Sequence, residues 1–275
     1  MRLQSGWTNS YKRLVSDGGV GIKKITFIGI QTKVIQPGDD IFECFIEAVE
    51  REGVELLDGD IVVVSESALA TAEGRVVRLC DVQPSDEAIE LGKRYSIEPE
   101  LMELIIQNSD MIIGGIPGFV LTLKDGFLCP NAGIDLSNVP PGYAGLMPED
   151  PEKSARELRI KIKKRTGKRV GVVIGDSRTH PLRLGCVGIA LACSGFRGVK
   201  DVRGELDLFG KPLKITRSAV GDNIVSGAQL VMGEGGERIP FVIVRGIDLK
   251  LGDVDEKMPT VPPEECLYFG LIRRN

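Results

Sequence analysis

The sequence has little of what a metal-cluster or disulfide protein needs. Of its 275 residues, 5% are aromatic, one is tryptophan and one is histidine, His180. A zinc site needs clustered cysteine and histidine ligands, whereas the six cysteines are scattered and form no CxxC pair. The composition therefore excludes a zinc module and is typical of a reducing compartment. Cys44, Cys186 and Cys193 stand in apolar runs, which predicts that they are small core residues.

An excess of positive charge is also missing, and so is any long apolar run. Lys and Arg number 35 against 39 Asp and Glu, giving a net charge of −4. Nucleic-acid-binding proteins usually carry a basic excess. No segment approaches the roughly 20 apolar residues of a membrane span, and the beginning of the chain lacks the apolar core of a signal peptide. We therefore expect a cytoplasmic protein that binds neither nucleic acid nor membrane.

Two common phosphate-binding motifs are absent as well. The chain has neither a GxxxxGK loop followed by Ser or Thr nor a GxGxxG turn after a strand, which argues against P-loop and Rossmann nucleotide sites. Glycine, by contrast, is abundant, with 34 residues, about 12% against a typical value of about 7%. Glycine allows tight turns and lets the backbone approach a ligand closely.

The hydrophobic pattern predicts one main folded region with two flanking segments. Residues 1–22 are a polar extension that holds Trp7, residues 23–250 form the main region with two interwoven subdomains, and residues 251–275 are a C-terminal tail. Strands and helices interleave without strict βαβ alternation, and hairpins are frequent. This pattern favours an α+β fold with mixed sheets over a doubly wound parallel sheet. The expected strands cover 25–28, 60–64, 111–113, 119–121, 127–128, 170–174, 187–191 and 241–244, with a hairpin over 206–215. The expected helices run from 41 to 52, from 85, from 96, over 151–166 and over 219–232.

Three polar segments next to apolar strands are the candidates for chemistry. The first, 131–138, reads Asn-Ala-Gly-Ile-Asp-Leu-Ser-Asn. Its Asp135, with two amide side chains, has the oxygen donors that hold a hard cation. Asp and Asn also form local turns with their own backbone, so a purely structural turn is an equal alternative.

The second segment, 175–183, follows an apolar strand directly. Asp176 and Ser177 stand side by side and suit Mg²⁺ or Mn²⁺, while Arg178, His180 and Arg183 suit a phosphate or carboxylate. A Ser-His-Asp hydrolase is a weaker interpretation, because these residues are too close in sequence for the usual triad and no GxSxG turn exists. The remaining alternative is a structural turn.

The third segment, 232–237, reads Met-Gly-Glu-Gly-Gly-Glu at the end of an expected helix. Its glycines permit backbone N–H groups to face a phosphate, while the Glu234 carboxylate reaches a metal. A glycine-rich helix C-cap is the structural alternative.

The order of these segments carries a family resemblance. Ala-Glu-Gly-Arg at 72–75 comes first, then the segment at 131–138, then 166–172 leading into Asp176 and Ser177, then Met-Gly-Glu-Gly-Gly at 232–236. In this order they resemble the coenzyme F-420 γ-glutamyl ligase family, and the resemblance runs from about residue 25 to 246. It implies a family-specific α+β fold that forms an intertwined homodimer.

The resemblance also implies an activity. Members of the family use GTP and divalent metals to activate a substrate carboxylate, which the amine of L-glutamate attacks to form an amide. By resemblance, Asp135, Asp176 and Ser177 would be metal ligands, joined by Glu234. The nucleotide would contact Ile30, Gln31, Thr32, Lys33, Glu66, Ser67, Asn138, Leu230, Val231, Met232, Gly233, Glu234, Gly235, Gly236 and Glu237.

Two departures from the family pattern concern substrate recognition. The family has Ser-Lys before Ala-Glu-Gly-Arg, with the lysine on the nucleotide, whereas this chain has Ala70 and Thr71. The family loop reads Asp-Thr-x-Gly-Arg, and here Thr179 and His180 replace Gly-Arg while Arg183 is kept. We therefore expect an acceptor other than the deazaflavin coenzyme and leave the nucleotide open.

The sequence thus predicts a metal- and nucleotide-dependent amide ligase that adds L-glutamate to a carboxylate-bearing acceptor. Asp176, Arg178, His180 and Arg183 are its expected catalytic residues, with GTP and Mg²⁺ or Mn²⁺ as the expected nucleotide and metal. The alternative is a non-catalytic relative of such enzymes that binds an anionic metabolite.

Overall fold

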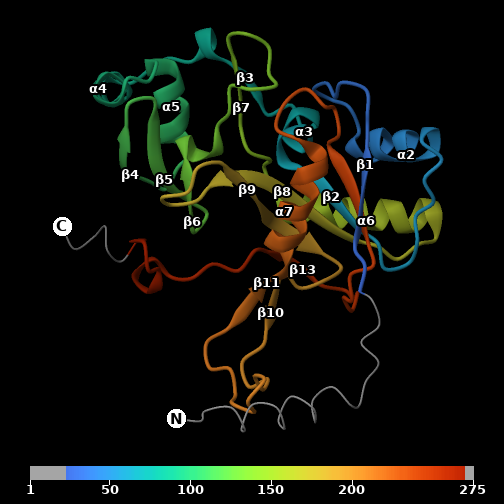
Figure 1. Ribbon diagram of the computed structural model, residues 1–275. Coiled ribbons are helices and arrows are strands. Elements are labelled where there is room, and N and C mark those ends of the chain that lie inside the picture. Colours follow the sequence, from blue (N-terminus) through green and yellow to red (C-terminus); the bar gives the residue numbers. More distant parts are fainter. Residues whose placement is uncertain (1–22, 270–275) are drawn as a thin grey trace, which may run out of the picture.

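A computed structural model describes residues 23–269, so the expected extension with Trp7 lies outside the described residues. The centre is a six-stranded mixed sheet in the order β1-β12-β2-β8-β9-β13 (Figure 1). Only β2 and β8 pair in parallel, and the other neighbours pair antiparallel. The strands are β1 (Thr26–Ile30), β2 (Ile61–Ser65), β8 (Gly171–Thr179), β9 (Cys186–Ser194), β12 (Phe241–Arg245) and β13 (Asp255–Lys257).

Helices cover both faces of this sheet, because its central strands are apolar on both sides. Val62 and Val64 of β2 belong to the core under α2 (Ile41–Arg51) and α6 (Pro151–Thr166). Their neighbours Ile61 and Val63 belong to the core under α7 (Val220–Met232). Successive side chains of a strand point to opposite faces, so one apolar run serves two cores.

A second group of elements packs around its own core, at the upper left of Figure 1. It combines a three-stranded sheet, a short strand pair and two helices, with buried side chains such as Met102, Ile105 and Val120. Its elements are β3 (Val76–Arg78), η1 (Leu79–Asp81), α4 (Asp86–Tyr95), α5 (Pro99–Gln107), β4 (Met111–Ile116), β5 (Phe119–Lys124), β6 (Phe127–Pro130), η2 (Asn131–Gly133) and β7 (Tyr143–Gly145). The mixed α+β architecture expected from the sequence is confirmed.

An arm extends from the body at the bottom of Figure 1. It begins and ends with the paired strands β10 (Val199–Asp201) and β11 (Arg217–Ala219). The hairpin expected over 206–215 is present as a short reversal without extended strands. Leu206 and Pro212 form an antiparallel bridge, and the backbone N–H of Asp207 donates to the carbonyl of Lys211 over 2.8 Å.

Local capping signals placed the helices correctly. The side chain of Asp40 accepts a hydrogen bond from the backbone N–H of Phe42, Ser85 caps α4, and Asp150 caps α6. Gly167 ends α6 at φ 74°, a left-handed conformation that glycine adopts without steric cost.

The structure corrects the expected end of one strand. We expected a strand over 170–174 and a polar loop over 175–183, but β8 continues to Thr179 and pairs with β9 along this extension. Because the partner strand satisfies the backbone hydrogen bonds, polar side chains are tolerated on the extension. Only 180–185 remain as the connecting turn.

Further differences lie near the C-terminus and in the helices. Part of the segment expected as a tail forms β13, which pairs with β9, and η3 (Pro263–Glu265) follows. A short helix, α3 (Glu66–Ala72), begins directly after β2 and was not expected. Cys44 and Cys193 are buried as expected, but Cys186 is exposed because it begins β9 next to the connecting turn of the β8–β9 hairpin.

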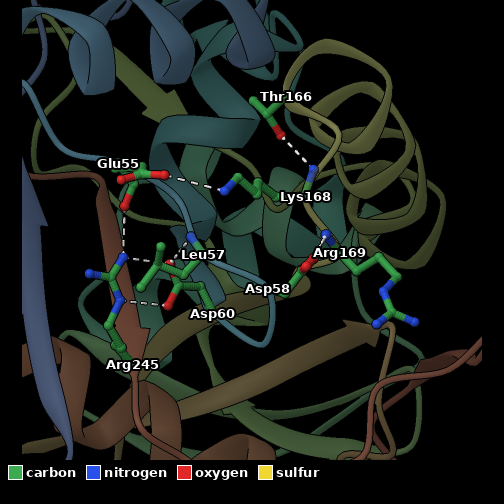
Figure 2. A network of polar contacts seen from close by, with 8 residues as sticks. All are labelled: Glu55, Leu57, Asp58, Asp60, Thr166, Lys168, Arg169 and Arg245. Atoms are coloured by element: carbon green, nitrogen blue, oxygen red, sulfur yellow. Dashed lines mark hydrogen bonds and ion pairs between the residues drawn. The ribbon is translucent and has the colours of Figure 1, made fainter.

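A polar network fixes the starting ends of β2 and β8 (Figure 2). The carboxylate of Asp60, 1% exposed, accepts hydrogen bonds of 2.8 and 2.7 Å from Nε and Nη2 of Arg245. The backbone N–H of Gly171 donates to the carbonyl of Asp60 over 2.9 Å, and the backbone N–H of Arg169 donates to Asp58 over 2.6 Å. These bonds hold β2 and β8 together at their starting ends. Within residues 23–269, no helix is long and apolar enough to cross a membrane.

Candidate active site

The parallel pairing of β2 and β8 brings two carboxylates together at the ends of these strands. Ser65 and Gly175 are partners in the register, so Glu66 and Asp176 follow them side by side. Glu66 is 9% exposed. Burial raises the pKa of Glu66 well above its ordinary value, and the charges of Asp176 and Asp135 raise it further. Glu66 was expected only as a nucleotide contact. In the structure it belongs to a cluster of carboxylates with Asp176 and Asp135.

Asp176 and Ser177 lie on opposite faces of β8. Asp176 and Arg178 are turned inward, whereas Ser177 and Thr179 are exposed, as strand alternation requires. Burial raises the pKa of Asp176, against the lowering effect of Arg178. On a strand the side chains of Asp176 and Ser177 point to opposite faces, so the shared metal corner is not formed by these two side chains alone, and the metal role of Ser177 stays a prediction from the resemblance. The same alternation separates Ser177 from Asp176 in the hydrolase interpretation.

Asp135 approaches this cluster of carboxylates from the second group of elements, which has its own core. Its backbone is bridged to Gly145, and its Oδ1 accepts a 3.0 Å hydrogen bond from the backbone N–H of Ser137. The Ser137 hydroxyl also donates to the Asp135 carboxylate. The structural turn that we weighed for this segment is therefore present. The charge of Asp135 nevertheless raises the pKa of both Glu66 and Asp176, so the turn presents the carboxylate to the site.

Arg178 is the positively charged side chain among these carboxylates. Its Nε donates to Asp176 over 3.1 Å and its Nη1 donates to the carbonyl of Leu128 over 3.0 Å. The guanidinium lies 4.1 Å from the ring centroid of Phe127, a cation–π arrangement that fixes its plane. Arg178 therefore joins the main sheet to the three-stranded sheet.

Two loops that the resemblance assigns to a nucleotide lie side by side next to this group. The Gln31 side-chain amide donates to the carbonyl of Glu237 over 3.1 Å, and the backbone N–H of Thr32 donates to that of Arg238 over 2.9 Å. The backbone N–H of Ser65 donates to the carbonyl of Pro240 over 2.8 Å. The loop after β1 and the loop before β12 are thus adjacent to the start of α3, where Glu66 lies.

The glycine-rich loop after α7 is folded around a carboxylate of its own. The backbone N–H of Gly235 donates to the Glu237 carboxylate over 2.8 Å. A Cβ on Gly233 would lie 2.4 Å from the carboxyl carbon of Glu237, and Gly233 has φ 74°, so glycine is required there. Glu234 is engaged with the side chain of Gln229. Gly233 also ends α7, so the loop is a helix C-cap and an anion-compatible turn at once.

Other expected residues lie apart from the carboxylates. His180 and Arg183 stand on the exposed turn between β8 and β9, with the His180 ring 6.0 Å from that of Tyr268. Among residues 23–269, no hydrogen bond or ion pair joins either of them to Asp176. Asn138 is exposed, and Lys33 is paired with Asp39 over 2.9 Å. Thr71 lies on α3, where its hydroxyl donates to the carbonyl of Ser67.

Sequence reasoning missed three contributors. Asp222, on α7, accepts a 2.9 Å hydrogen bond from the backbone N–H of Ala190, burial raises its pKa, and the charge of Arg178 lowers it. Phe127 and Leu128 were expected only as hairpin residues. No local pattern marks these residues, because their roles arise from contacts between distant segments.

The oxygen donors of the site fit a hard cation only in part. Within residues 23–269, no three His, Cys, Asp or Glu side chains are gathered closely enough to enclose an ion by themselves. Mg²⁺ is usually held by one or two carboxylates together with water and substrate phosphates. Asp135 and Asp176 therefore suit an ion that arrives with a nucleotide.

Comparison with known proteins gives these segments a common context. The family model described as F420-0:Gamma-glutamyl ligase matches residues 29–246. The chain belongs to this ligase family. The match begins within β1 and ends directly after β12, so it includes all the segments gathered at the site and leaves β13 outside.

Individual members of the ligase family are similar over most of the chain. The coenzyme F420:L-glutamate ligase of Methanopyrus kandleri is 40% identical over 235 residues, which are 85% of this chain and 91% of its own length. The protein of the same name from Methanocaldococcus jannaschii is 38% identical over 247 residues, 90% of this chain and 97% of its own. That from Archaeoglobus fulgidus is 40% identical over 216 residues, 78% and 85% of the two chains.

Proposed function

We propose that this protein joins L-glutamate to a carboxylate-bearing acceptor in a reaction that consumes a nucleoside triphosphate such as GTP and requires Mg²⁺ or Mn²⁺. The observation that carries the proposal is the convergence of Glu66, Asp135 and Asp176 beside the loops at 30–33 and 230–237. Membership of the ligase family and the names of the similar proteins support the amide-forming reaction and its amino acid.

The proposed reaction has two steps, activation of the acceptor carboxylate and formation of the amide. A carboxylate oxygen of the acceptor attacks the terminal phosphorus of the nucleotide, and the bond to the leaving nucleoside diphosphate breaks. The amine of glutamate then attacks the acyl carbon, loses a proton and displaces phosphate, which leaves an amide. Such chemistry depends on positioning and on neutralising negative charge, with little covalent participation by the protein.

This reaction assigns a role to each residue of the site. Asp135 and Asp176 would hold the metal ion, which supplies positive charge against the phosphates. Glu66 is the adjoining buried carboxylate. Leu230, Val231 and Met232, expected as nucleotide contacts, are the last residues of α7 and not part of a loop. The loops after β1 and after α7 offer backbone N–H groups, which suit phosphate oxygens. Ser177 and Glu234 as metal ligands, and Ser67 and Asn138 as nucleotide contacts, stay predictions from the resemblance.

The proposed enzyme is a homodimer, as the resemblance implies. The arm between β10 and β11 supports this, because Leu206, Leu208 and Ile215 on it are 68%, 75% and 83% exposed. Exposed apolar side chains gathered on one protrusion are typical of a surface that another chain covers.

The central experiment replaces Asp176 with Asn. We expect Asp176→Asn to lose nucleotide- and metal-dependent ligation, because the amide removes the charge that a hard cation needs. Coupled nucleotide hydrolysis and amide formation are measured with and without Mn²⁺. The matched control is Asp253→Asn, the same change at a fully exposed position outside the site, which should behave as wild type.

Full metal-independent activity of Asp176→Asn would contradict the proposal. Binding of an anionic metabolite without metal dependence, together with no turnover in the wild-type protein, would favour the non-catalytic alternative. Calorimetry on the same preparations distinguishes these results.

A further inference from the structure

One donor of the central arginine has no partner. The side chain of Arg178 is 7% exposed. Its Nε and Nη1 are satisfied by Asp176 and Leu128, but Nη2 is buried and forms no hydrogen bond with any described residue between 23 and 269. A buried donor of this kind costs about 1–3 kcal/mol, more when charged. Such groups in native proteins call for an explanation such as a bound ligand or ion.

The position of Nη2 is fixed from three directions. The Phe127 ring holds the plane of the guanidinium, and the two existing hydrogen bonds fix its rotation within that plane. The unpaired N–H group therefore has a defined direction at the seam between β8 and β6. The one remaining nitrogen can give a carboxylate oxygen a charge-assisted hydrogen bond, which is stronger than one between neutral groups.

The charges around Arg178 favour a singly charged partner. Asp176 already pairs with the guanidinium, and Glu66 and Asp222 feel its charge through space. A doubly charged phosphate would meet these carboxylates without enough positive charge from the protein, whereas one carboxylate oxygen needs only the remaining N–H group. The partner is therefore a carboxylic acid rather than a phosphate.

We propose that Nη2 of Arg178 binds one carboxylate oxygen of the acceptor at the β8–β6 seam and so selects a carboxylic acid and orients it beside Asp176. This inference rests on the proposed ligase function and specifies its substrate contact. The second carboxylate oxygen is left free to attack the nucleotide. His180 and Arg183, on the exposed turn, are then contacts for more distant parts of the acceptor.

The test measures acceptor binding separately from turnover. The probe is the deazaflavin precursor of coenzyme F-420, whose carboxylate should bind at Arg178 even where the β8–β9 turn supports its ligation poorly. It is titrated calorimetrically in the presence of Mn²⁺ and a non-hydrolysable GTP analogue. Arg178→Gln removes the charge, and Arg178→Lys keeps it but cannot serve both Asp176 and the acceptor. We expect the acceptor Kd to rise about 10- to 100-fold in both variants, with glutamate KM and nucleotide Kd unchanged. Arg197→Gln, at a side chain that is 74% exposed, should bind as wild type.

Each result decides a different point. If Arg178 serves only to hold Asp176, the variants will lose Mn²⁺ affinity and keep the acceptor Kd, and the inference is wrong while ligation by wild type preserves the proposed function. If the precursor binds through Arg178 but neither wild type nor the double variant Thr179→Gly, His180→Arg ligates it, the proposed function is wrong and the carboxylate site stands. Wild type that neither binds nor ligates the precursor overturns the inference. Should Arg178→Gln fail to fold, Arg178→Lys decides the same comparison.

Discussion

At the scale of single residues, chemistry in this protein depends on which neighbours the fold supplies. In the sequence, Glu66 is only a nucleotide contact implied by the resemblance. In the structure it begins α3, where an acidic residue suits the helix dipole. In the structure it is buried beside Asp176 and within reach of the charge of Asp135. Like charges and burial both oppose ionisation, so the folded protein holds a proton on this carboxyl more tightly than the unfolded chain does.

This burial predicts a stability effect that depends on pH. The pKa of Glu66 is raised from 4.5 in the folded state, so the folded state binds more protons above that pH. Stability then falls as pH rises from about 4.5 through the folded-state pKa. We expect Glu66→Gln to remove part of this fall, so that its free energy of unfolding relative to wild type improves from pH 4 to pH 8.

Urea unfolding at pH 4, 6 and 8 in the presence of a metal chelator measures the effect. Glu90→Gln, at an exposed position on α4, is the matched control and should follow the wild-type curve. Parallel curves for Glu66→Gln and wild type would show that burial of this carboxyl has no energetic consequence.

At the scale of elements, the contact of β9 with α7 positions the inner side of the site. The hydroxyl of Ser226 donates to the carbonyl of Gly188 over 2.6 Å. Asp222 accepts from Ala190 one turn earlier on the same helix. The hairpin of β8 and β9 therefore rests on a helix whose C-terminal end leads into the glycine-rich loop.

The closeness of this contact predicts a large effect of one methyl group. A Cβ on Gly188 would lie 2.7 Å from the carbonyl carbon of Val225 and 2.8 Å from the N of Ser226. Because both are backbone atoms of a helix, they cannot move alone. We expect Gly188→Ala to lower the free energy of unfolding by about 1–3 kcal/mol, measured by urea denaturation. Gly252→Ala, where a Cβ meets no atom within 4 Å, should be nearly neutral, and equal effects of the two changes would contradict the argument.

The turn between β8 and β9 is the element that we expect to set acceptor choice. His180 replaces the arginine of the family pattern there, and an imidazole does not reproduce the permanently charged bidentate clamp of a guanidinium. Pro181 also restricts His180 to extended backbone. We expect poor ligation of the deazaflavin precursor by wild type and a gain in the double variant Thr179→Gly, His180→Arg.

Steady-state ligation with glutamate, nucleotide and metal compares the two proteins. The exposed double change should leave nucleotide binding intact, which serves as the internal control. Efficient turnover of the precursor by wild type would show that Arg178 alone satisfies the acceptor and that the turn does not discriminate.

At the scale of the whole molecule, the structure is two packed bodies with an arm (Figure 1). The site lies where these two bodies meet, since Arg178 of the main sheet donates a hydrogen bond to Leu128 of the three-stranded sheet in the second body. The Asp60–Arg245 network (Figure 2) secures the opposite ends of the same strands. Residues that are far apart along the chain therefore meet at one place in the structure.

The arm makes a prediction about assembly. Leu206 and Leu208 are exposed on it, and burying them against a second copy would contribute apolar stabilisation. We expect wild type to sediment as a dimer and the double variant Leu206→Glu, Leu208→Glu to sediment as a monomer with an unchanged circular dichroism spectrum. The control Lys211→Glu, exposed on the same arm, should leave the dimer in place. A monomeric wild type would remove the dimer from the proposal.

The sequence by itself determined the local features. The caps at Asp40, Ser85 and Asp150 are hydrogen bonds between residues two or three apart, so the residue types sufficed to locate the starts of α2, α4 and α6. The order of the polar motifs was likewise enough to indicate the family, which the comparison confirmed.

Only the tertiary structure decided how these features combine. Glu66 and Asp176 are 110 positions apart and meet because β2 and β8 pair in parallel. The polar segment after Ile174 became a strand because β9 supplied its hydrogen bonds, and this turned Asp176 and Ser177 to opposite faces. The physical reason is that strand pairing and burial are set by segments far away in the chain, so a local pattern can predict the donors of a site but not which of them face one another.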